Sequence, residues 1–355
     1  MKNIKIKKTT KQDFITYAGV ILAFVILTVM GDAGMLSRSL KGQLVPICCY
    51  IVMAVSLNLT VGILGELSLG HAGFMSVGAF SGVIAAMSLQ GAIPSPVLRL
   101  AIALVVGAVF AAIAGTLIGI PVLRLRGDYL AIVTLAFGEI IKELINCLIV
   151  GVDSEGLHII FNITGAKTVA DLHMVEGGRA IIKGAQGATG TETIASFTAG
   201  FILIMISLVI ILNLVRSRSG RAIMALRDNR IAAESVGINV TKYKMMAFVT
   251  SAALAGAAGA LYGLNYSNLL STKFNFNTSI LVLVFVVLGG LGNIRGSIIA
   301  AAILTLLPEM LRSFADYRML VYAIVLILVM LGTNNAQVKQ LIGKIVPSKL
   351  RKEAK

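Results

Sequence analysis

Runs of about 20 apolar residues, the length of a helix that crosses the hydrocarbon core of a bilayer, recur along most of this 355-residue chain. Short polar connections separate them. This pattern predicts a series of membrane-spanning helices. We expect ten spans, at residues 14–30, 43–62, 67–89, 97–121, 128–150, 196–215, 245–264, 278–291, 297–311 and 317–333.

Two of these segments allow another reading. The apolar region from 278 to 311 is interrupted by "GGLGNIRG", and we interpret it as two short segments. The first segment follows the basic stretch "MKNIKIKKTTK" and could be a signal peptide. Its apolar run is long for such a peptide, and "GDAGMLS" is a poor cleavage site, so a span is favoured.

The composition agrees with a membrane protein. Charged residues make up 13% of the chain, roughly half of the share in soluble domains, and 57% of residues are hydrophobic. The predicted fold class is an all-α integral membrane protein, a polytopic bundle of eight to ten spans. We expect a basic N-terminus (1–13), one transmembrane domain (14–333) and a basic tail (334–355).

The net charge of +15 does not indicate a nucleic-acid binder. The basic residues gather at segment ends, and no basic patch is interleaved with stacking aromatic residues. Because Lys and Arg concentrate on the cytoplasmic side, both termini are predicted to be cytoplasmic in a multi-pass protein of the cell membrane. The loop 151–195, with five acidic and three basic residues, then lies outside.

The chain offers no evident catalytic machinery. Cys48, Cys49 and Cys147 lie in apolar segments, with no spacing that suits zinc or a disulfide framework. His158 and His173 are too isolated for a metal site. We therefore predict no enzyme activity, no catalytic residues and no metal.

The charged loop 216–244 has its own pattern. "SGRAIMALRDN" favours a helix, Asp228 or Asn229 can cap a new start, and "RIAAESV" gives about two further turns before Gly237. A short helix presented to the cytosol is either a docking element for a soluble partner or an amphipathic segment that rests on anionic membrane lipid.

A resemblance favours docking. "AAESVG" resembles the cytoplasmic E-A-A-x-x-x-G loop of ABC importer permeases, with Ile231 in place of the leading Glu. Over residues 220–263 the chain resembles the branched-chain amino acid ABC importer permeases, of the LivM type. The resemblance implies that ATPase subunits dock on this loop. The residues expected to serve docking are Arg227, Asp228, Arg230, Ala232, Ala233, Glu234 and Gly237.

Three other blocks are similar to the same family: "LNLTVGILGELSLGHAGFMSVGAFSG" (57–82), "RLRGDYLAIVTLAFGEIIKELI" (124–145) and "VVLGGLGNIRGSIIAAAIL" (286–304). Ser297 stands where the family usually has Pro. The outer loop reads "GVDSEGLHII" instead of the family's "TGGSDGL". Since that loop faces the solute-binding partner in the family, this departure concerns the identity of the solute.

The resemblance implies a permease subunit that translocates leucine, isoleucine and valine. It also implies two ATPase subunits, a homologous second permease and an extracytoplasmic solute-binding protein as partners. This chain itself is expected to bind no cofactor, because Gly343–Lys344 lacks the rest of a P-loop; ATP and Mg would bind to the partner subunits. Related permeases for nucleosides, urea or short amides remain alternatives, as does an ion-coupled secondary transporter that uses Glu139 and His71.

Ionisable and irregular positions inside spans are candidates for the translocation path. Glu139, Lys142 and Glu143 either contact a zwitterion or pair with one another, and pairing is favoured. His71 is more consistent with a hydrogen-bonded packing residue than with a proton relay. The glycines 62, 65, 70, 73 and 78 either unwind helices or pack them tightly. We expect the second, third, fifth and eighth segments to line the path, with the candidate residues Ser68, His71, Phe74, Thr134, Phe137, Glu139, Lys142, Gly289, Gly290 and Gly292.

Overall fold

The structure is a computed structural model that describes residues 8–35, 37–125, 127–154, 156–162, 167–175 and 177–311, with four single positions between 320 and 327. The chain divides into two compact units, Met1–Ala302 and Ile303–Lys355. The first unit contains every helix from α1 to α10 and the beginning of α11. The predicted tail 334–355 and most of the predicted span 317–333 lie outside the described residues.

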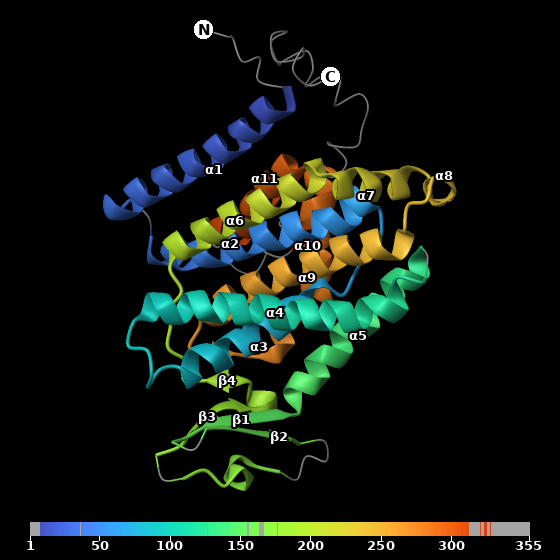
Figure 1. Ribbon diagram of the computed structural model, residues 1–355. Helices are drawn as coiled ribbons and strands as arrows, with labels where there is room; N and C mark the ends of the chain where they lie inside the picture. Colours follow the sequence, from blue (N-terminus) through green and yellow to red (C-terminus); the bar gives the residue numbers. More distant parts are fainter. Residues whose placement is uncertain are drawn as a thin grey trace. The chain divides into compact units, whose positions relative to one another are not determined.

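Helices dominate the described residues (Figure 1), which confirms the predicted helical membrane fold. Seven of them are long and apolar enough to cross a membrane, and all seven coincide with predicted spans. The helices are α1 (Lys8–Asp32), α2 (Arg38–Asn58), α3 (His71–Ser88), α4 (Pro96–Val122), α5 (Asp128–Asn146), α6 (Phe197–Arg216), α7 (Arg218–Asp228), α8 (Arg230–Ser235), α9 (Val240–Gly263), α10 (Phe276–Gly289) and α11 (Ile294–Met310).

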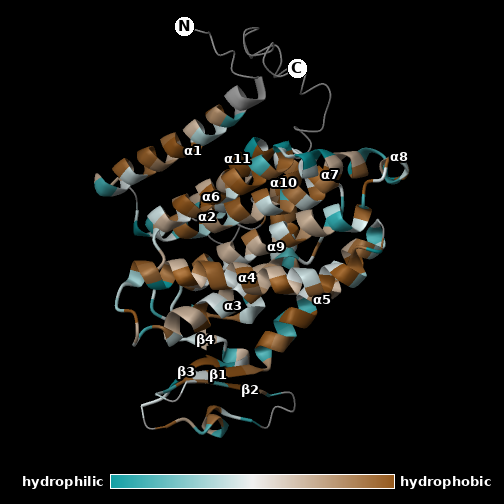
Figure 2. Ribbon diagram, in the orientation of Figure 1, coloured by the Kyte–Doolittle hydropathy of each residue, from teal (hydrophilic) through white to brown (hydrophobic). Residues whose placement is uncertain are grey.

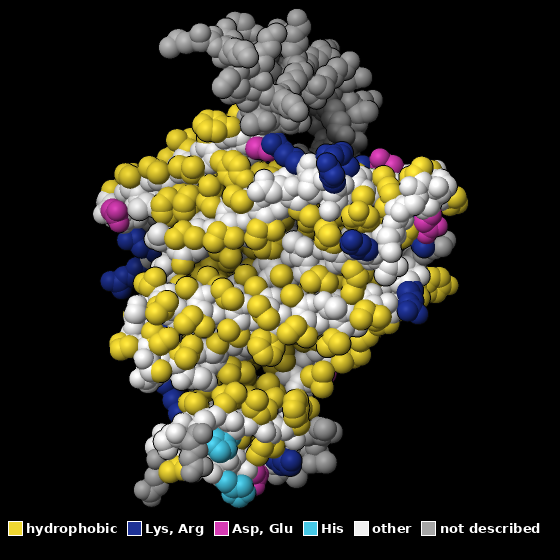
Figure 3. Space-filling view, in the orientation of Figure 1, with side chains coloured by type: hydrophobic (Ala, Val, Ile, Leu, Met, Phe, Trp, Pro, Cys, Tyr) yellow, Lys and Arg dark blue, Asp and Glu magenta, His cyan; other side chains and the backbone are white. Residues whose placement is uncertain are grey.

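The helices α5 and α11 form where spans were expected, but they fall outside the set of seven. α5 contains Asp128, Glu139, Lys142 and Glu143 within 19 residues, and α11 has only 17 residues. The count of ten spans therefore stays a prediction. Figure 2 shows that hydrophobic residues dominate the long helices, whereas hydrophilic ones gather at their ends. On the face in Figure 3, apolar side chains cover the helices and charged side chains lie at its margins, as expected of a surface in contact with lipid.

The core is built around α3, α4 and α9, which pack along one another through small residues. A Cβ atom on Gly78 would lie 2.0 Å from the carbonyl oxygen of Gly256, and one on Gly256 would lie 2.3 Å from Cβ of Ala111. Small side chains let helix backbones approach closely in a membrane, where van der Waals packing is a main source of helix association. Cys48 and Cys49 are buried with free thiols.

The chain between α2 and α3 departs from the α-helix. A π-helical turn, Leu59–Leu64, follows α2, Gly65 has a φ of +82°, and residues 65–70 are irregular. Of the two readings left open for the glycines there, unwinding applies to this segment, which we call the α2–α3 break (residues 59–70). Gly73 and Gly78 instead lie inside regular α3, where they serve close packing.

The connection between α5 and α6, predicted to lie outside, contains a sheet that the sequence analysis did not predict. Five antiparallel strands lie in the order β2-β1-β3-β4-β5, and the last comes from the connection between α9 and α10. The predicted span 128–150 is too long: α5 ends at Asn146, because the apolar run that follows pairs as β1. The strands are β1 (Leu148–Val152), β2 (Leu157–Phe161), β3 (Arg179–Lys183), β4 (Ala188–Thr189) and β5 (Asn268–Leu269).

Ion pairs mark the two ends of the bundle. Arg216, the last residue of α6, pairs with Asp13 near the start of α1. Near the N-terminal ends of α4 and α6, the buried Arg99 lies 2.9 Å from Glu192. The start of α1 therefore lies beside the end of α6 that leads into α7 and α8. The sheet lies in the connections α5–α6 and α9–α10, at the opposite ends of these helices (Figure 1).

Close packing of α3 on α9 gives the first testable prediction. Gly78→Ala should lower the free energy of unfolding by about 1–3 kcal/mol, because the added methyl group meets backbone atoms that cannot yield. Gly42→Ala is the matched control, since nothing lies within 4 Å of its added Cβ in α2. Thermal unfolding in detergent measures both. Equal midpoints for the two variants would contradict the packing argument.

Candidate coupling and translocation site

The loop 216–244 folds as two helices, α7 and α8, as its sequence predicted. The side chain of Asn229 accepts a hydrogen bond from the backbone N–H of Ala232 at 3.0 Å and so caps the start of α8. Gly237 ends the turn after α8 with a φ of +83°. Of the two predicted caps, Asn229 rather than Asp228 takes this role.

One side of α8 packs on the loop itself, and the other faces outward. Ala233 is buried against Leu226 and Val240. Ile231 and Val236 are 80% and 74% exposed, although both are apolar. Ile231, Ala232 and Val236 are exposed and form the candidate docking surface, whereas Ala233 packs inside the loop. Arg230 and Glu234 pair along the helix at 3.0 Å.

Arg227 connects the loop to the interior. Its Nη1 donates a hydrogen bond to the carbonyl oxygen of Gly62 at 3.0 Å, and its Nε and Nη2 bind Asp228. Its aliphatic stem crosses Gly65, where a Cβ atom would lie 2.6 Å from Cγ of Arg227. Arg227 was predicted to serve ATPase docking, which stays a prediction; in this structure it contacts the α2–α3 break.

A second connection starts at the other end of the loop. Lys244 in the first turns of α9 is buried and forms an ion pair with Glu66. Sequence analysis missed Lys244, because a lysine next to a basic loop reads as part of the positive-inside pattern. No local signal separates Lys244 from the neighbouring Lys242, because both lie in the first turns of α9.

The last residue of α2 and the α2–α3 break together contact the turn between α10 and α11. The side chain of Asn58 donates to the hydroxyl of Ser297 at 2.9 Å and accepts from the N–H of Gly292 at 2.8 Å. A Cβ atom on Gly62 would lie 2.2 Å from the backbone nitrogen of Gly292. The turn itself requires glycine at positions 290 and 292, whose φ angles are +93° and +80°. Gly289 lies against Gly296.

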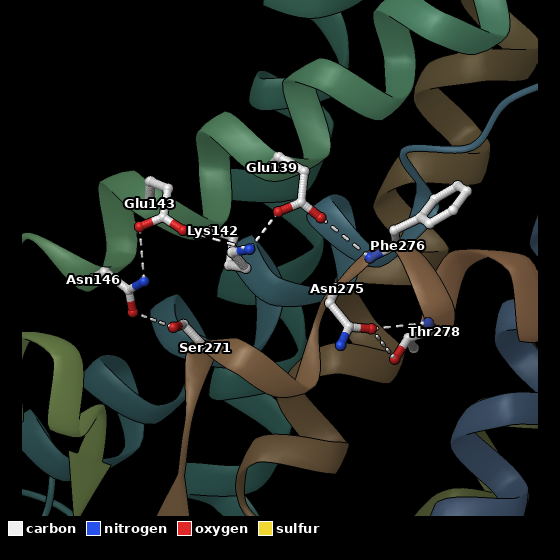
Figure 4. Close-up of polar contacts among 8 residues, drawn as sticks. All are labelled: Glu139, Lys142, Glu143, Asn146, Ser271, Asn275, Phe276 and Thr278. Atoms are coloured by element: carbon white, nitrogen blue, oxygen red, sulfur yellow. Dashed lines mark hydrogen bonds and ion pairs between the residues drawn. The ribbon is translucent and has the colours of Figure 1, made fainter.

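The charged residues of α5 pair with one another (Figure 4). Lys142 contacts Glu139 and lies 3.4 Å from Glu143, while the other oxygen of Glu139 accepts the N–H of Phe276 at 3.2 Å. Phe276 is the first residue of α10, where a carboxylate interacts favourably with the helix dipole. Pairing, the favoured reading, is thus what the structure contains; contact with a solute stays a prediction.

The polar contacts continue toward the sheet. Asn146, at the end of α5, donates to Glu143 at 3.0 Å and accepts from Ser271 (Figure 4). Asn146 also lines a cavity of about 470 Å³ near the sheet, together with Lys167 and Lys183. Among the described residues, no group of His, Cys, Asp and Glu has the arrangement of a metal site.

The other predicted path residues fall into two groups. The Thr134 hydroxyl accepts the N–H of Leu69 at 3.1 Å, and Glu139 and Leu69 both line a narrow crevice between α5 and the start of α10. Ser68 is buried and Phe137 is half-buried.

His71 and Phe74 lie in a packed interior instead. The ring of His71 is hydrogen-bonded to Ser56 at 2.8 Å, and Phe74 packs edge-to-face on Phe248. His71 is therefore a buried, hydrogen-bonded packing residue, as the sequence analysis favoured. Gly289, Gly290 and Gly292 belong to the contacts around Gly62 and Asn58, not to the crevice.

Comparison with known proteins identifies the family. Residues 40–330 match the family described as "Branched-chain amino acid transport system / permease component". The chain belongs to this permease family. The predicted blocks at 57–82, 124–145, 220–263 and 286–304 all lie within the matched region.

This permease is similar to several named transport proteins. It is 35% identical over 295 residues to the high-affinity branched-chain amino acid transport system permease protein LivM of Escherichia coli K12, across 79% of this chain and 66% of the relative. It is 24% identical to a probable LivM of Methanocaldococcus jannaschii, across 70% of this chain and 74% of the relative. The LivH permease of Escherichia coli K12 is 32% identical, across 32% of this chain and 38% of the relative. No solved structure matches this permease.

The ion pairs of α5 lead to a second prediction. Glu139→Gln, Lys142→Gln and the double variant form a cycle whose coupling free energy should be about 1 kcal/mol, because the half-exposed pair is joined to the α10 N-terminus. Thermal unfolding of the three variants and the parent in detergent gives the value. Strictly additive effects would mean that the two side chains do not interact.

Proposed function

We propose that this protein is the membrane-spanning permease subunit of an ABC importer that moves branched-chain amino acids across the cytoplasmic membrane. The observation that carries the proposal is the similarity to LivM of Escherichia coli, whose printed name gives that role in high-affinity transport. The chain spans 66% of the length of that relative, and the match includes the loop, the breaks and most of the helices.

Energy would come from separate ATPase subunits that bind ATP and Mg. Docking on α8 is supported by Ile231 and Val236, two large apolar side chains that are exposed on a short charged helix. Exposed apolar groups rimmed by polar ones are typical of protein–protein contacts. Arg230 and Glu234 would lie at the polar rim.

A homologous second permease would complete the membrane part. α5 supports this, because its charged cluster is half-exposed although charges avoid contact with lipid. A partner helix or a water-filled path would cover them. Similarity to both LivM and LivH is consistent with two related permeases in one importer. The sheet and its cavity would face an extracytoplasmic solute-binding protein.

The orientation follows from the loop. If ATPases dock on α8 from the cytosol, the start of α1 would lie on the cytoplasmic side as well, and the ion pair between Asp13 and Arg216 supports this. The sheet then lies outside, in agreement with the acidic character of the loop 151–195.

Reconstitution tests the proposal directly. Proteoliposomes with this chain, its second permease and the ATPase subunits, supplied with the binding protein, should take up leucine only when ATP is provided to the ATPase side. Competition with isoleucine and valine, but not with a nucleoside, urea or a short amide, is expected. Accumulation of leucine by this chain alone under a proton or sodium gradient would instead identify an ion-coupled transporter.

The docking surface gives the third prediction. Ile231→Asp or Val236→Asp should weaken co-purification of the ATPase subunits at least about tenfold, because a charge replaces an apolar contact. Ile159→Asp, which alters an equally apolar side chain that is 52% exposed on the sheet, is the matched control. Full co-purification by both α8 variants would rule out this surface. Ala233→Arg is less informative, since it would also disrupt the contacts with Leu226 and Val240.

A further inference from the structure

Two cations bracket the α8 loop, and both reach the same short piece of chain. Arg227 is the penultimate residue of α7, and Lys244 lies in the first turns of α9. Their partners, the carbonyl oxygen of Gly62 and the carboxylate of Glu66, are only four positions apart in the α2–α3 break. Each end of the loop is thus fixed to one place in the membrane part.

The Arg227 contact depends on the irregular geometry of the break. A carbonyl in a regular α-helix is already occupied by an intrahelical hydrogen bond, whereas helix ends and π-turns leave carbonyls that need other partners. Gly62 lies in the π-helical turn. Gly65 leaves the space that the stem of Arg227 occupies.

The Lys244 contact is fixed by its burial. Lys244 is 4% exposed, and Glu66 is largely buried beside it. Separating a buried ion pair leaves two uncompensated charges, so the two side chains must move together. Displacement of the first turns of α9 therefore displaces the α2–α3 break.

The break passes such a displacement onward. Gly62 lies against Gly292, and Asn58 binds both the backbone of Gly292 and the side chain of Ser297. The turn between α10 and α11 is a short irregular connection between two helices, as the α2–α3 break is. When a protein changes conformation, rigid helices reorient about short irregular segments, because these segments absorb the large changes in backbone dihedral angles.

We propose that Arg227 and Lys244 are positioning residues that transmit the displacement of α8 to the α2–α3 break, and through Asn58 to the turn between α10 and α11. This rests on the proposed function, because it assumes an ATPase acting on α8. Neither residue touches the solute; both act by holding the loop and the break as one moving body.

The test is the number of leucine molecules taken up per ATP hydrolysed, measured in the reconstituted complex. Arg227→Gln should still co-purify with the ATPases and hydrolyse ATP, but transport about tenfold less leucine per ATP. Arg227→Lys retains a donor and should recover most of the ratio. Arg221→Gln on α7 and Lys242→Gln on α9 are matched controls, because their side chains are exposed, and they should behave like the parent.

A charge exchange tests the second connection. Lys244→Gln leaves Glu66 buried without its cation, so it is measured beside the double variant Lys244→Glu with Glu66→Lys. Recovery of the leucine-to-ATP ratio in the exchanged protein supports the proposal. If the exchanged protein reaches the membrane but its leucine-to-ATP ratio stays low, the role of Lys244 is overturned. If neither Lys244 variant accumulates in the membrane, the Arg227→Gln measurement decides whether the proposal holds.

The outcomes separate this inference from the proposed function. If the parent complex shows no ATP-dependent leucine uptake, the proposed function fails. If the parent transports leucine and Arg227→Gln has an unchanged ratio, only the present inference fails. Loss of ATPase co-purification in Arg227→Gln would make Arg227 a docking contact and would also overturn its positioning role.

Discussion

The structure depends on one constraint: a backbone polar group freed at membrane depth must find a partner inside the protein. The chain is irregular between α2 and α3 and between α10 and α11, and side chains from elsewhere in the chain bind the backbone groups freed there. Arg227 binds the carbonyl of Gly62, and Asn58 binds the N–H of Gly292. Thr134 and Ser279 accept the N–H groups of Leu69 and Ala72. The interruptions are therefore held by tertiary contacts, and they connect α5, α7, α10 and α11 to one region.

Charges obey the same constraint. The buried cations Arg99 and Lys244 each face a carboxylate from a different segment, and Lys142 lies between two glutamates. Each pair fixes one helix against a loop or against a neighbouring helix. Because loss of one partner costs far more than a surface ion pair contributes, these few charges restrict how the helices can shift. An apolar bundle without them would slide more freely.

Periodicity and local chemistry predicted most of the helices. Long apolar runs marked the spans, and Asn229 and Gly237 marked the limits of α8. The sheet was missed because "LIVGV" continues the apolar run of α5, and hydrophobicity alone does not distinguish a strand from the end of a span. Local sequence also could not show that Gly73 and Gly78 pack against other helices while Gly65 turns the chain. The role of each glycine depends on which part of the fold lies next to it.

The site was predictable in its parts but not in its connections. The resemblance selected the loop and its residues, yet the inward position of Ala233 and the partner of Arg227 depend on contacts between residues distant in sequence. Gly62 and Arg227 are 165 positions apart, and Glu66 and Lys244 are 178 apart. Neither composition nor spacing along the sequence indicates that such distant residues are in contact; the fold alone brings them together.

The fifth strand has a consequence for the end of the bundle opposite α8. β5 lies in the connection between α9 and α10, but it completes a sheet whose other strands come from the insertion between α5 and α6. Main-chain hydrogen bonds thus join two connections that belong to different helix pairs. The sheet therefore couples the C-terminal end of α5 to the N-terminal end of α10, so that displacement of one of these ends would strain the strands joined to the other.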